Sequence, residues 1–379
     1  GEDTAIGMAM EQSASTLEIT GFVTQDMLEH STIRVKSFEA LPESLHQSGV
    51  GNFHLETEVY GAGSNRTQNS FLIELAVPVW LINRKPAQLL NVLVGELPRL
   101  GFLTGFQLAG VELPDSFGPG PAFGSQGILG LLDKTQGPVL CRAMRPGVGL
   151  DMETMAALNY EALVGGFHLV KDDELIEFSD TAAFRNHLVQ MLNARDEAMQ
   201  VTGEKKLYIA NLFCEPGELN ERWECALELG ADAVLVAPFI QGMGVVPYLA
   251  RQAEVPILAH NSFVDLLTRN TAWGIDDEVI CHWLRHLGGD WFVTPGTFAA
   301  ANMDLEKCRS LMTIATRAEG EIKPMMPNLQ GGKHPEGLAS YINAVGDRDF
   351  MLIVANWIDS HPDGLQQGAR IFREALDSF

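Results

Sequence analysis

The chain has 379 residues, of which 46% are hydrophobic, and its formal net charge at pH 7 is −23. A surface this acidic repels nucleic acid and anionic membranes, so neither is expected as a partner. No apolar run approaches the roughly 20 residues of a membrane span, and the scattered cysteines lack CxxC spacing, which indicates reduced thiols in a cytoplasmic protein rather than disulfides or a zinc site.

The first third of the chain mixes predicted strands and helices without strict alternation, which is typical of a small α+β domain. Residues 1–16 have neither a basic flank nor an apolar stretch, and we expect a disordered leader there. Residues 17–135 are predicted to form the α+β domain, with a helix beginning near Pro86. A segment rich in Gly, Pro and Ser, 114–127, indicates the domain boundary. The strands expected in this domain are 31–41, 69–83 and 105–114.

From residue 136 to residue 379 the pattern becomes regular, because short apolar runs alternate with helical segments. The runs are nearly continuously apolar, as expected for parallel strands buried on both faces. Eight strand–helix units of this kind predict a (β/α)8 TIM barrel. A doubly wound open sheet is the alternative, but no G-x-G-x-x-G loop follows the first strand. The predicted strands are 137–146, 167–173, 206–213, 232–239, 255–263, 290–296, 322–329 and 350–358.

A run of charged residues, Lys171-Asp172-Asp173-Glu174, follows the second of these strands. Active sites of such barrels lie at the carboxyl ends of the strands, and strand alternation points Lys171 and Asp173 inward together. Glu174 begins the turn and can reach them. Converging carboxylates suit a hard cation such as Mg²⁺. Lys171 beside a cation is then either a base with a lowered pKa or a carbamate formed with CO2. An ion-pair network bracing the barrel mouth is the alternative interpretation.

The stretch "GGFHLVKDDE", 165–174, resembles the signature of the RuBisCO superfamily. The resemblance implies that Lys171 becomes a carbamate and holds Mg²⁺ together with Asp173 and Glu174. It also implies a ferredoxin-like arrangement for the N-terminal α+β domain. Weaker matches occur in the expected order, and "GGDWFVTPG" is similar to the RuBisCO-like branch of the family; these segments are 145–151, 258–261, 288–296, 330–335 and 361–364.

The departures from the family pattern affect carboxylation. Arg145 and Gly147 stand where carboxylating members have lysines, and an arginine cannot serve as a base near neutral pH. The loop after the sixth strand, 295–304, contains no lysine. Asn261 stands where the family has a phosphate-binding arginine, and large side chains replace consecutive glycines in 354–362. Carboxylation of ribulose bisphosphate is therefore not expected.

The resemblance also suggests roles for further residues. His260 is a candidate general base or a structural histidine. Arg145 either binds an anionic substrate group or pairs with Asp173 or Glu174. The residues expected to contact substrate are Asn261, Gly331, Gly332, Lys333 and Glu96. Among these, Lys333 is either a charge partner or a solvent-facing lysine.

Together these features predict a RuBisCO-like protein that uses Mg²⁺ to remove a proton alpha to a carbonyl. The expected activity is that of an enolase, isomerase or decarboxylase acting on a small sugar-derived ketone or keto acid. A metal-dependent retro-aldol lyase and a non-catalytic binding or regulatory dimer are the alternatives. The resemblance further implies a homodimer whose site lies between the barrel of one chain and the N-terminal domain of the other.

Overall fold

The computed structural model describes residues 1–13, 21–42, 70–101, 103–270, 272–295, 298, 304–318 and 320–379. The chain forms two compact units. The first contains Gly1–Val111 together with Leu266–Val279, and the second contains Glu112–Asp265 and Ile280–Phe379. The predicted boundary at 135 is therefore wrong, because 112–135 belong to the second unit.

The second unit is a closed barrel of eight parallel strands, which confirms the (β/α)8 prediction and excludes the open sheet. The strands follow the chain in order around the barrel, with β12 pairing with β4 to close it. Every strand residue of β4 to β8 is buried, as the apolar runs indicated. The strands are β4 (Val139–Ala143), β5 (Leu169–Lys171), β6 (Leu207–Asn211), β7 (Ala233–Val236), β8 (Ile257–Ala259), β10 (Trp291–Val293), β11 (Met326–Leu329) and β12 (Met351–Val354).

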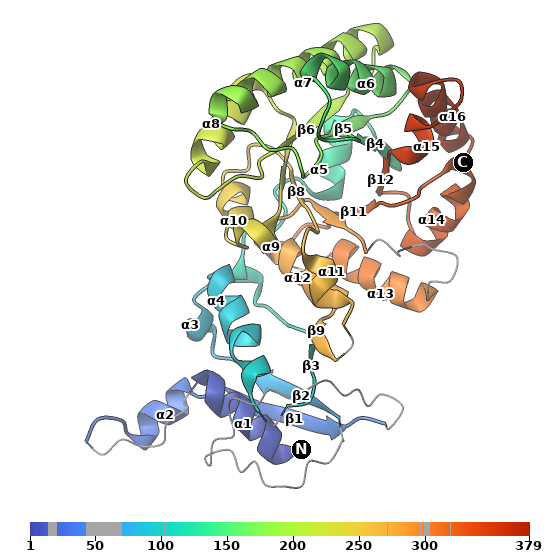
Figure 1. The fold of residues 1–379 in the computed structure, drawn as a ribbon. Helices are drawn as coiled ribbons and strands as arrows, with labels where there is room; N and C mark the ends of the chain where they lie inside the picture. Colours follow the sequence, from blue (N-terminus) through green and yellow to red (C-terminus); the bar gives the residue numbers. More distant parts are fainter. Residues whose placement is uncertain are drawn as a thin grey trace. The chain divides into compact units, whose positions relative to one another are not determined.

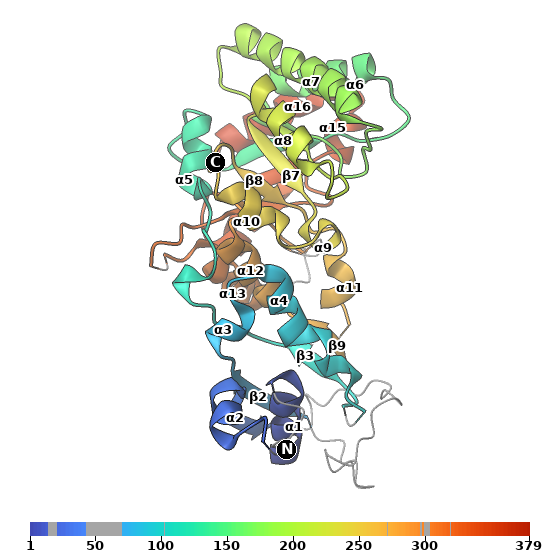
Figure 2. The same ribbon diagram turned by 90° about the vertical axis from the view of Figure 1, so that its left-hand side faces the viewer.

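Helices surround these strands, and Figures 1 and 2 show α6, α7 and α16 side by side on the outside of the barrel. Side chains placed before the helices start them: Asp180 accepts a hydrogen bond from Ala183 N at 2.7 Å and so caps α7. Gly203, with φ +70°, ends the same helix. The helices of this unit are α5 (Gly124–Leu131), α6 (Met152–Val164), α7 (Thr181–Thr202), α8 (Leu219–Leu229), α9 (Pro238–Gln241), α10 (Val245–Ala250), α12 (Asp277–Leu287), α13 (Leu305–Thr316), α14 (Leu338–Val345), α15 (Asn356–Asp359) and α16 (Leu365–Asp377).

The core of this unit fills the inside of the barrel. Inward side chains of all eight strands form one cluster, which Ile128 and Leu129 of α5 join. These α5 residues pack beside Val139 at the start of β4, so the helix covers the amino-terminal end of the barrel. Four of the five cysteines are buried and Cys214 is partly buried, and burial raises the pKa of the Cys141 thiol to about 12. These thiols are therefore packing groups, as the sequence indicated.

A buried carboxylate holds the segment that leads into α5. Asp290 accepts hydrogen bonds from the backbone N–H groups of Phe123 at 2.8 Å, Gly124 at 2.7 Å and Ile257 at 2.9 Å. The segment also packs closely, because a Cβ atom at Gly118 would lie 1.9 Å from the backbone oxygen of His286. The glycines of 114–127 are thus used for close contact with the barrel rather than as a linker.

The first unit begins with a helix, so the predicted disordered leader is wrong over most of its length. Helix α1 (Glu2–Ser13) buries Ala5, Met8 and Ala9, and Met8 belongs to a small core with Leu97 and Leu100. Residues 14–16 lie outside the described residues. Apart from Met8, the residues that α1 buries are small (Ala5, Gly7 and Ala9), which explains why the sequence gives no amphipathic signal.

The rest of the first unit is an α+β arrangement, as predicted. Strands β1 (Arg34–Ala40) and β2 (Phe71–Ala76) pair antiparallel, and β3 (Phe106–Leu108) pairs parallel with β9 (Trp273–Ile275). The ferredoxin-like arrangement stays a prediction, because residues 43–69 lie outside the described part of the chain. The helices are α2 (Gln25–Ser31), α3 (Val79–Ile82) and α4 (Pro86–Leu90), followed by a π-helical turn at Asn91–Gly95 and a 3-10 turn at Leu97–Arg99. Helix α11 (Val264–Thr268) contains the point, between Asp265 and Leu266, at which the chain passes from the second unit to the first. Among the described residues, no helix has the length and apolar character needed to span a membrane.

Candidate active site

Lys171 is the last residue of β5, and its side chain enters the barrel. It pairs across the sheet with Ala143 and Ile209, which both belong to the interior cluster. Only 2% of Lys171 is exposed. Its Nζ donates to the backbone oxygen of Asp172 at 2.8 Å and to Glu174 Oε2 at 3.2 Å. The ammonium is therefore buried inside the barrel mouth and paired with one carboxylate.

Glu174 connects three other charged or polar side chains. One oxygen, Oε2, contacts Lys171 and lies 3.4 Å from His260 Nε2, while Oε1 accepts from Arg145 at 3.2 Å. Burial alone would raise the pKa of Glu174, but the Lys171 ammonium and the His260 ring outweigh it and lower the pKa to about 2. Glu174 is thus a carboxylate throughout the ordinary pH range.

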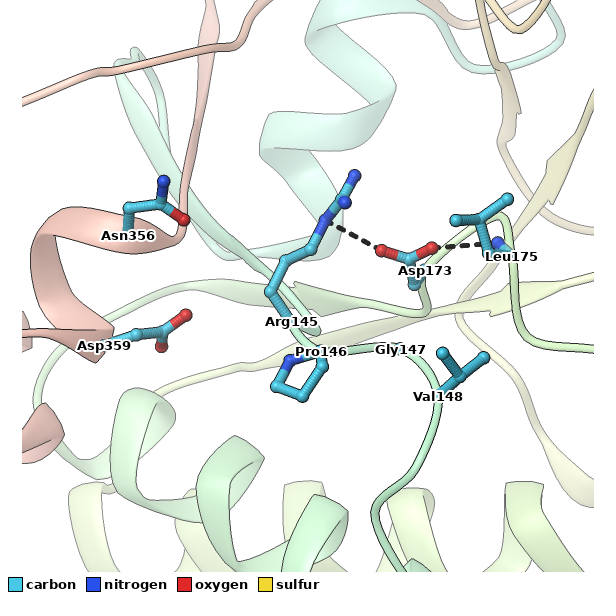
Figure 3. Close-up of a pocket in the computed structure, with 8 residues that line it drawn as sticks. All are labelled: Arg145, Pro146, Gly147, Val148, Asp173, Leu175, Asn356 and Asp359. Atoms are coloured by element: carbon cyan, nitrogen blue, oxygen red, sulfur yellow. Dashed lines mark hydrogen bonds and ion pairs between the residues drawn. The ribbon is translucent and has the colours of Figure 1, made fainter.

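Arg145, two residues beyond β4, joins Glu174 to Asp173. Its Nε lies 2.8 Å from Asp173 Oδ2, as Figure 3 shows, while the other Asp173 oxygen accepts from Leu175 N at 2.8 Å. Asp173 is 1% exposed. Asp173 can lie this close to the backbone only because residue 147 is glycine, since a Cβ atom on Gly147 would lie 2.3 Å from Asp173 Cβ. Gly147 therefore makes room for this ion pair.

His260 follows β8 and is held as a neutral ring. Its Nδ1 accepts the Ser262 backbone N–H at 3.2 Å and lies 2.8 Å from Ser262 Oγ. Burial lowers the pKa of His260 to about 4, and the Lys171 ammonium adds to this effect while Glu174 opposes it. With Nδ1 accepting, the ring proton is on Nε2 and faces Glu174. His260 is placed as a hydrogen-bond donor in this arrangement, not as a ready base.

Asp172 fixes the backbone of the charged run, a role that the sequence analysis missed. It is fully buried and accepts hydrogen bonds from the Tyr208 hydroxyl, from His187 Nε2 at 2.8 Å and from Asn211 N at 2.9 Å. The Asn211 side chain in turn donates to the backbone oxygen of Asp173 at 3.2 Å. Strand alternation could have predicted this position of Asp172, because a residue between two inward side chains must face the surrounding helices.

A pocket of about 440 Å³ opens beside Arg145. Figure 3 shows Asn356 and Asp359 of α15 on the opposite side of Arg145 from Asp173. Asp359 is neutralised by the buried Arg142, whose Nε lies 3.0 Å from Asp359 Oδ1. The pocket is lined by Arg145, Pro146, Gly147, Val148, Asp173, Leu175, Asn356 and Asp359.

Two predicted substrate-binding residues contact neighbouring loops instead of this pocket. Lys333 is buried, and its Nζ donates to the Phe298 backbone oxygen at 3.1 Å and lies 5.0 Å from the Tyr341 ring centre. Burial lowers the pKa of Lys333. Asn261 accepts a hydrogen bond from Gln330 at 3.2 Å, which ties the loops after β8 and β11. Of the two interpretations of Lys333, the solvent-facing one is therefore wrong.

The remaining predicted contacts are spread over both units. Gly331 and Gly332 have φ of +74° and +59°, and both are exposed after β11. Both residues are glycines in the left-handed region, where a side chain would be strained. Glu96 belongs to the first unit, where it pairs with Arg99 at 2.5 Å. Its part in the site stays a prediction.

The donor set fits Mg²⁺ only after a change at Lys171. In this arrangement, two carboxylates are balanced by the ammonium of Lys171 and the guanidinium of Arg145. Among the described side chains, no three His, Cys, Asp or Glu residues are arranged as a metal site. A carbamate at Lys171 would replace a cation by an anion and leave three oxygen-bearing anions facing one guanidinium. Hard oxygen donors with excess negative charge are what Mg²⁺ prefers.

Comparison with known proteins agrees with this barrel. The family model described as the ribulose bisphosphate carboxylase large chain, catalytic domain, matches residues 125–379. The ribulose bisphosphate carboxylase of Methanocaldococcus jannaschii is 27% identical over 93% of this chain and 91% of that protein. The 2,3-diketo-5-methylthiopentyl-1-phosphate enolase of Bacillus velezensis is 27% identical over 85% of this chain and 79% of that protein. The crystal structure of a rubisco-like protein (MtnW) from Alicyclobacillus acidocaldarius has a TM-score of 0.84 at 27% identity, covering 100% of this chain and 90% of that chain.

Proposed function

Because this chain belongs to the family of the ribulose bisphosphate carboxylase large chain, we propose that it is a RuBisCO-like enzyme that enolises a small sugar-derived ketone or keto acid without carboxylating it. The resemblance found in the sequence is thereby confirmed at the level of the superfamily. The name of the Bacillus velezensis relative, an enolase, supports the same class of chemistry. Isomerase or decarboxylase activity would begin with the same proton abstraction.

The convergence of Lys171, Asp173 and Glu174 is the observation that carries the proposal. One buried amine lies against one carboxylate at the barrel mouth, and a second carboxylate is reached through Arg145. After carbamylation of Lys171, these three side chains would hold Mg²⁺. The bound cation would polarise the substrate carbonyl and so acidify the proton on the neighbouring carbon.

The surrounding residues define what else this chain would do. His260, neutral and protonated on Nε2, would donate a hydrogen bond to Glu174 or to a substrate oxygen. Arg145 cannot remove a proton, because its guanidinium stays charged. The lysines expected of a carboxylase are absent at 145 and 147, so the proposed reaction ends before CO2 addition.

The test is deuterium exchange into a panel of ketoses, diketones and keto acids, with MgCl2 and bicarbonate present. Wild type is expected to exchange the proton next to the carbonyl, whereas Lys171→Met should not, since it has no amine to carbamylate. Lys205→Met is the matched control, because it removes the same positive charge from an exposed lysine. A ¹³C-bicarbonate spectrum should show a carbamate signal in wild type that Lys171→Met lacks.

One observation favours the non-catalytic alternative. Both carboxylates already have cationic partners, so a plain ion-pair network could brace the barrel mouth without any metal. The enzyme hypothesis predicts a carbamate signal in wild type, and the ion-pair hypothesis predicts none. Wild type without a carbamate and without exchange on any compound of the panel would favour the binding protein.

We also propose that the protein is a cytoplasmic homodimer with its site completed by the N-terminal domain of the second chain. The five cysteines are scattered along the chain without CxxC spacing, which supports a reducing compartment. Sedimentation equilibrium tests the assembly, and a concentration-independent mass of one chain, 41.4 kDa, would contradict it.

A further inference from the structure

Arg145 occupies an unusual place for a substrate-binding cation. Its guanidinium contacts Asp173 at 2.8 Å and Glu174 at 3.2 Å, so one side chain bridges both carboxylates. The two carboxylates are largely buried, with side-chain exposures of 1% and 15%, whereas 49% of the Arg145 side chain is exposed. Arg145 therefore reaches the carboxylates from the pocket side and covers them.

The backbone at Arg145 is fixed, while its side chain has room to move. Its carbonyl oxygen accepts from the buried Arg142 at 3.3 Å, and Arg142 is itself anchored to Asp359 and to Asn159 at 3.1 Å. The side chain faces the pocket of about 440 Å³. Figure 3 shows Asn356 on the other side of this side chain from Asp173. A rotation about the side-chain bonds would carry the guanidinium from Asp173 toward Asn356 without any backbone change.

A divalent cation and this guanidinium would compete for the same oxygens. A cation held by Asp173 and Glu174 removes the negative charge that retains Arg145 and repels it directly. The other carboxylate of the pocket, Asp359, is already paired with Arg142. Released into the pocket, Arg145 would be an unbalanced cation with five N–H donors, which match the oxygens of a carboxylate or phosphate.

We propose that Arg145 is an exchangeable counter-ion, which holds Asp173 and Glu174 until a divalent cation takes them and then binds an oxyanion group of the substrate. The inference rests on the proposed function, since it assumes the metal site. It deepens that function by naming the substrate class, a chelating ketone or keto acid with a carboxylate or phosphate at one end. Cation and oxyanion would then bind cooperatively, because the cation releases Arg145 from the two carboxylates and the released Arg145 binds the oxyanion.

The first measurement is Mn²⁺ binding by isothermal titration in bicarbonate buffer. Arg145→Gln should bind Mn²⁺ about 10-fold more tightly than wild type, a size typical of coupling between two ligands. Arg145→Lys should fall between the two, because a point charge bridges both carboxylates poorly. Arg185→Gln is the matched control: this exposed arginine pairs with Glu228, and its loss should leave Mn²⁺ affinity unchanged.

The second measurement is sulfate binding with and without Mn²⁺. Wild type should bind sulfate more tightly when Mn²⁺ is present, by about 5-fold or more. Arg145→Gln should show no such difference, which separates binding at Arg145 from binding to the metal itself.

The outcomes distinguish the two proposals. If neither wild type nor Arg145→Gln binds Mn²⁺, the metal site and the proposed function fail together. If wild type binds Mn²⁺ but Arg145→Gln binds it no more tightly, the counter-ion inference is overturned while the metal site stands. Sulfate binding that depends on Mn²⁺ equally in both proteins would also overturn it. Urea unfolding of each variant shows whether it is folded.

Discussion

Replacing Gly147 by Ala tests the close contact on which the charged cluster depends. The new Cβ would lie 2.3 Å from Asp173 Cβ and 2.6 Å from Cγ, whereas carbon atoms in contact are normally about 3.5–4.0 Å apart. The Gly147 backbone is not in the left-handed region, so the contact alone decides the outcome. Asp173 must therefore retreat by about 1 Å or more.

The cost has two parts. Overpacking of a tight site costs about 1–3 kcal/mol, and weakening the 2.8 Å hydrogen bond from Leu175 N to Asp173 adds about 1 kcal/mol. We therefore expect Gly147→Ala to lower the free energy of unfolding by about 2–4 kcal/mol. Urea titration followed by tryptophan fluorescence measures this as a lower midpoint at unchanged slope.

The control for this experiment is Gly130→Ala on α5. A Cβ atom there meets nothing within 4 Å, and the backbone is helical. The alanine should raise the free energy of unfolding by about 0.5–1 kcal/mol, because it restricts the unfolded chain. A Gly147→Ala protein that is as stable as Gly130→Ala would refute the reasoning, since the two differ chiefly in the contact with Asp173.

Three further outcomes are expected, each measured by urea unfolding. Asp290→Ala removes the acceptor for three backbone N–H groups, two of them buried, and should cost about 3–6 kcal/mol; a loss below about 1 kcal/mol would contradict this. Burial raises the pKa of Asp290. The free energy of unfolding of wild type, measured relative to Asp290→Asn, should therefore be highest below about pH 4 and should decline as pH rises through the pKa of the folded protein. A free-energy difference that grows with pH would contradict this. Arg142→Met leaves the partly exposed Asp359 without its cation and should cost about 1–3 kcal/mol, part of which the double variant with Asp359→Asn should recover; equal losses in the single and double variants would exclude a coupled pair.

The barrel was predictable because its signal is strong and local. Each strand is a short apolar run, and each is followed by a helix with a clear end, such as Gly203 after α7. The contact between Lys171 and Glu174 could also be predicted from the sequence, because both residues lie at the carboxyl end of one barrel strand.

Other features depended on contacts that no local pattern encodes. The glycines of 114–127 suggested a domain boundary, and nothing in the local pattern showed that Gly118 is needed for its close approach to His286. Likewise, Asp172 acquires its role from His187 and Tyr208, which are distant along the chain. The bridge that Arg145 makes between two carboxylates was only one of two interpretations, since a sequence does not give distances.

The parallel pairing of β3 with β9 has a consequence for dividing the protein. Strand β9 is encoded within the barrel half of the sequence, between β8 and α12, yet Trp273 packs in the core of the first unit. A fragment ending at Val111 would lack this strand, and a fragment beginning at Glu112 would carry it with its partner missing. Neither half is therefore a transferable module, and recombination between relatives at this boundary would have to exchange Leu266–Val279 as well.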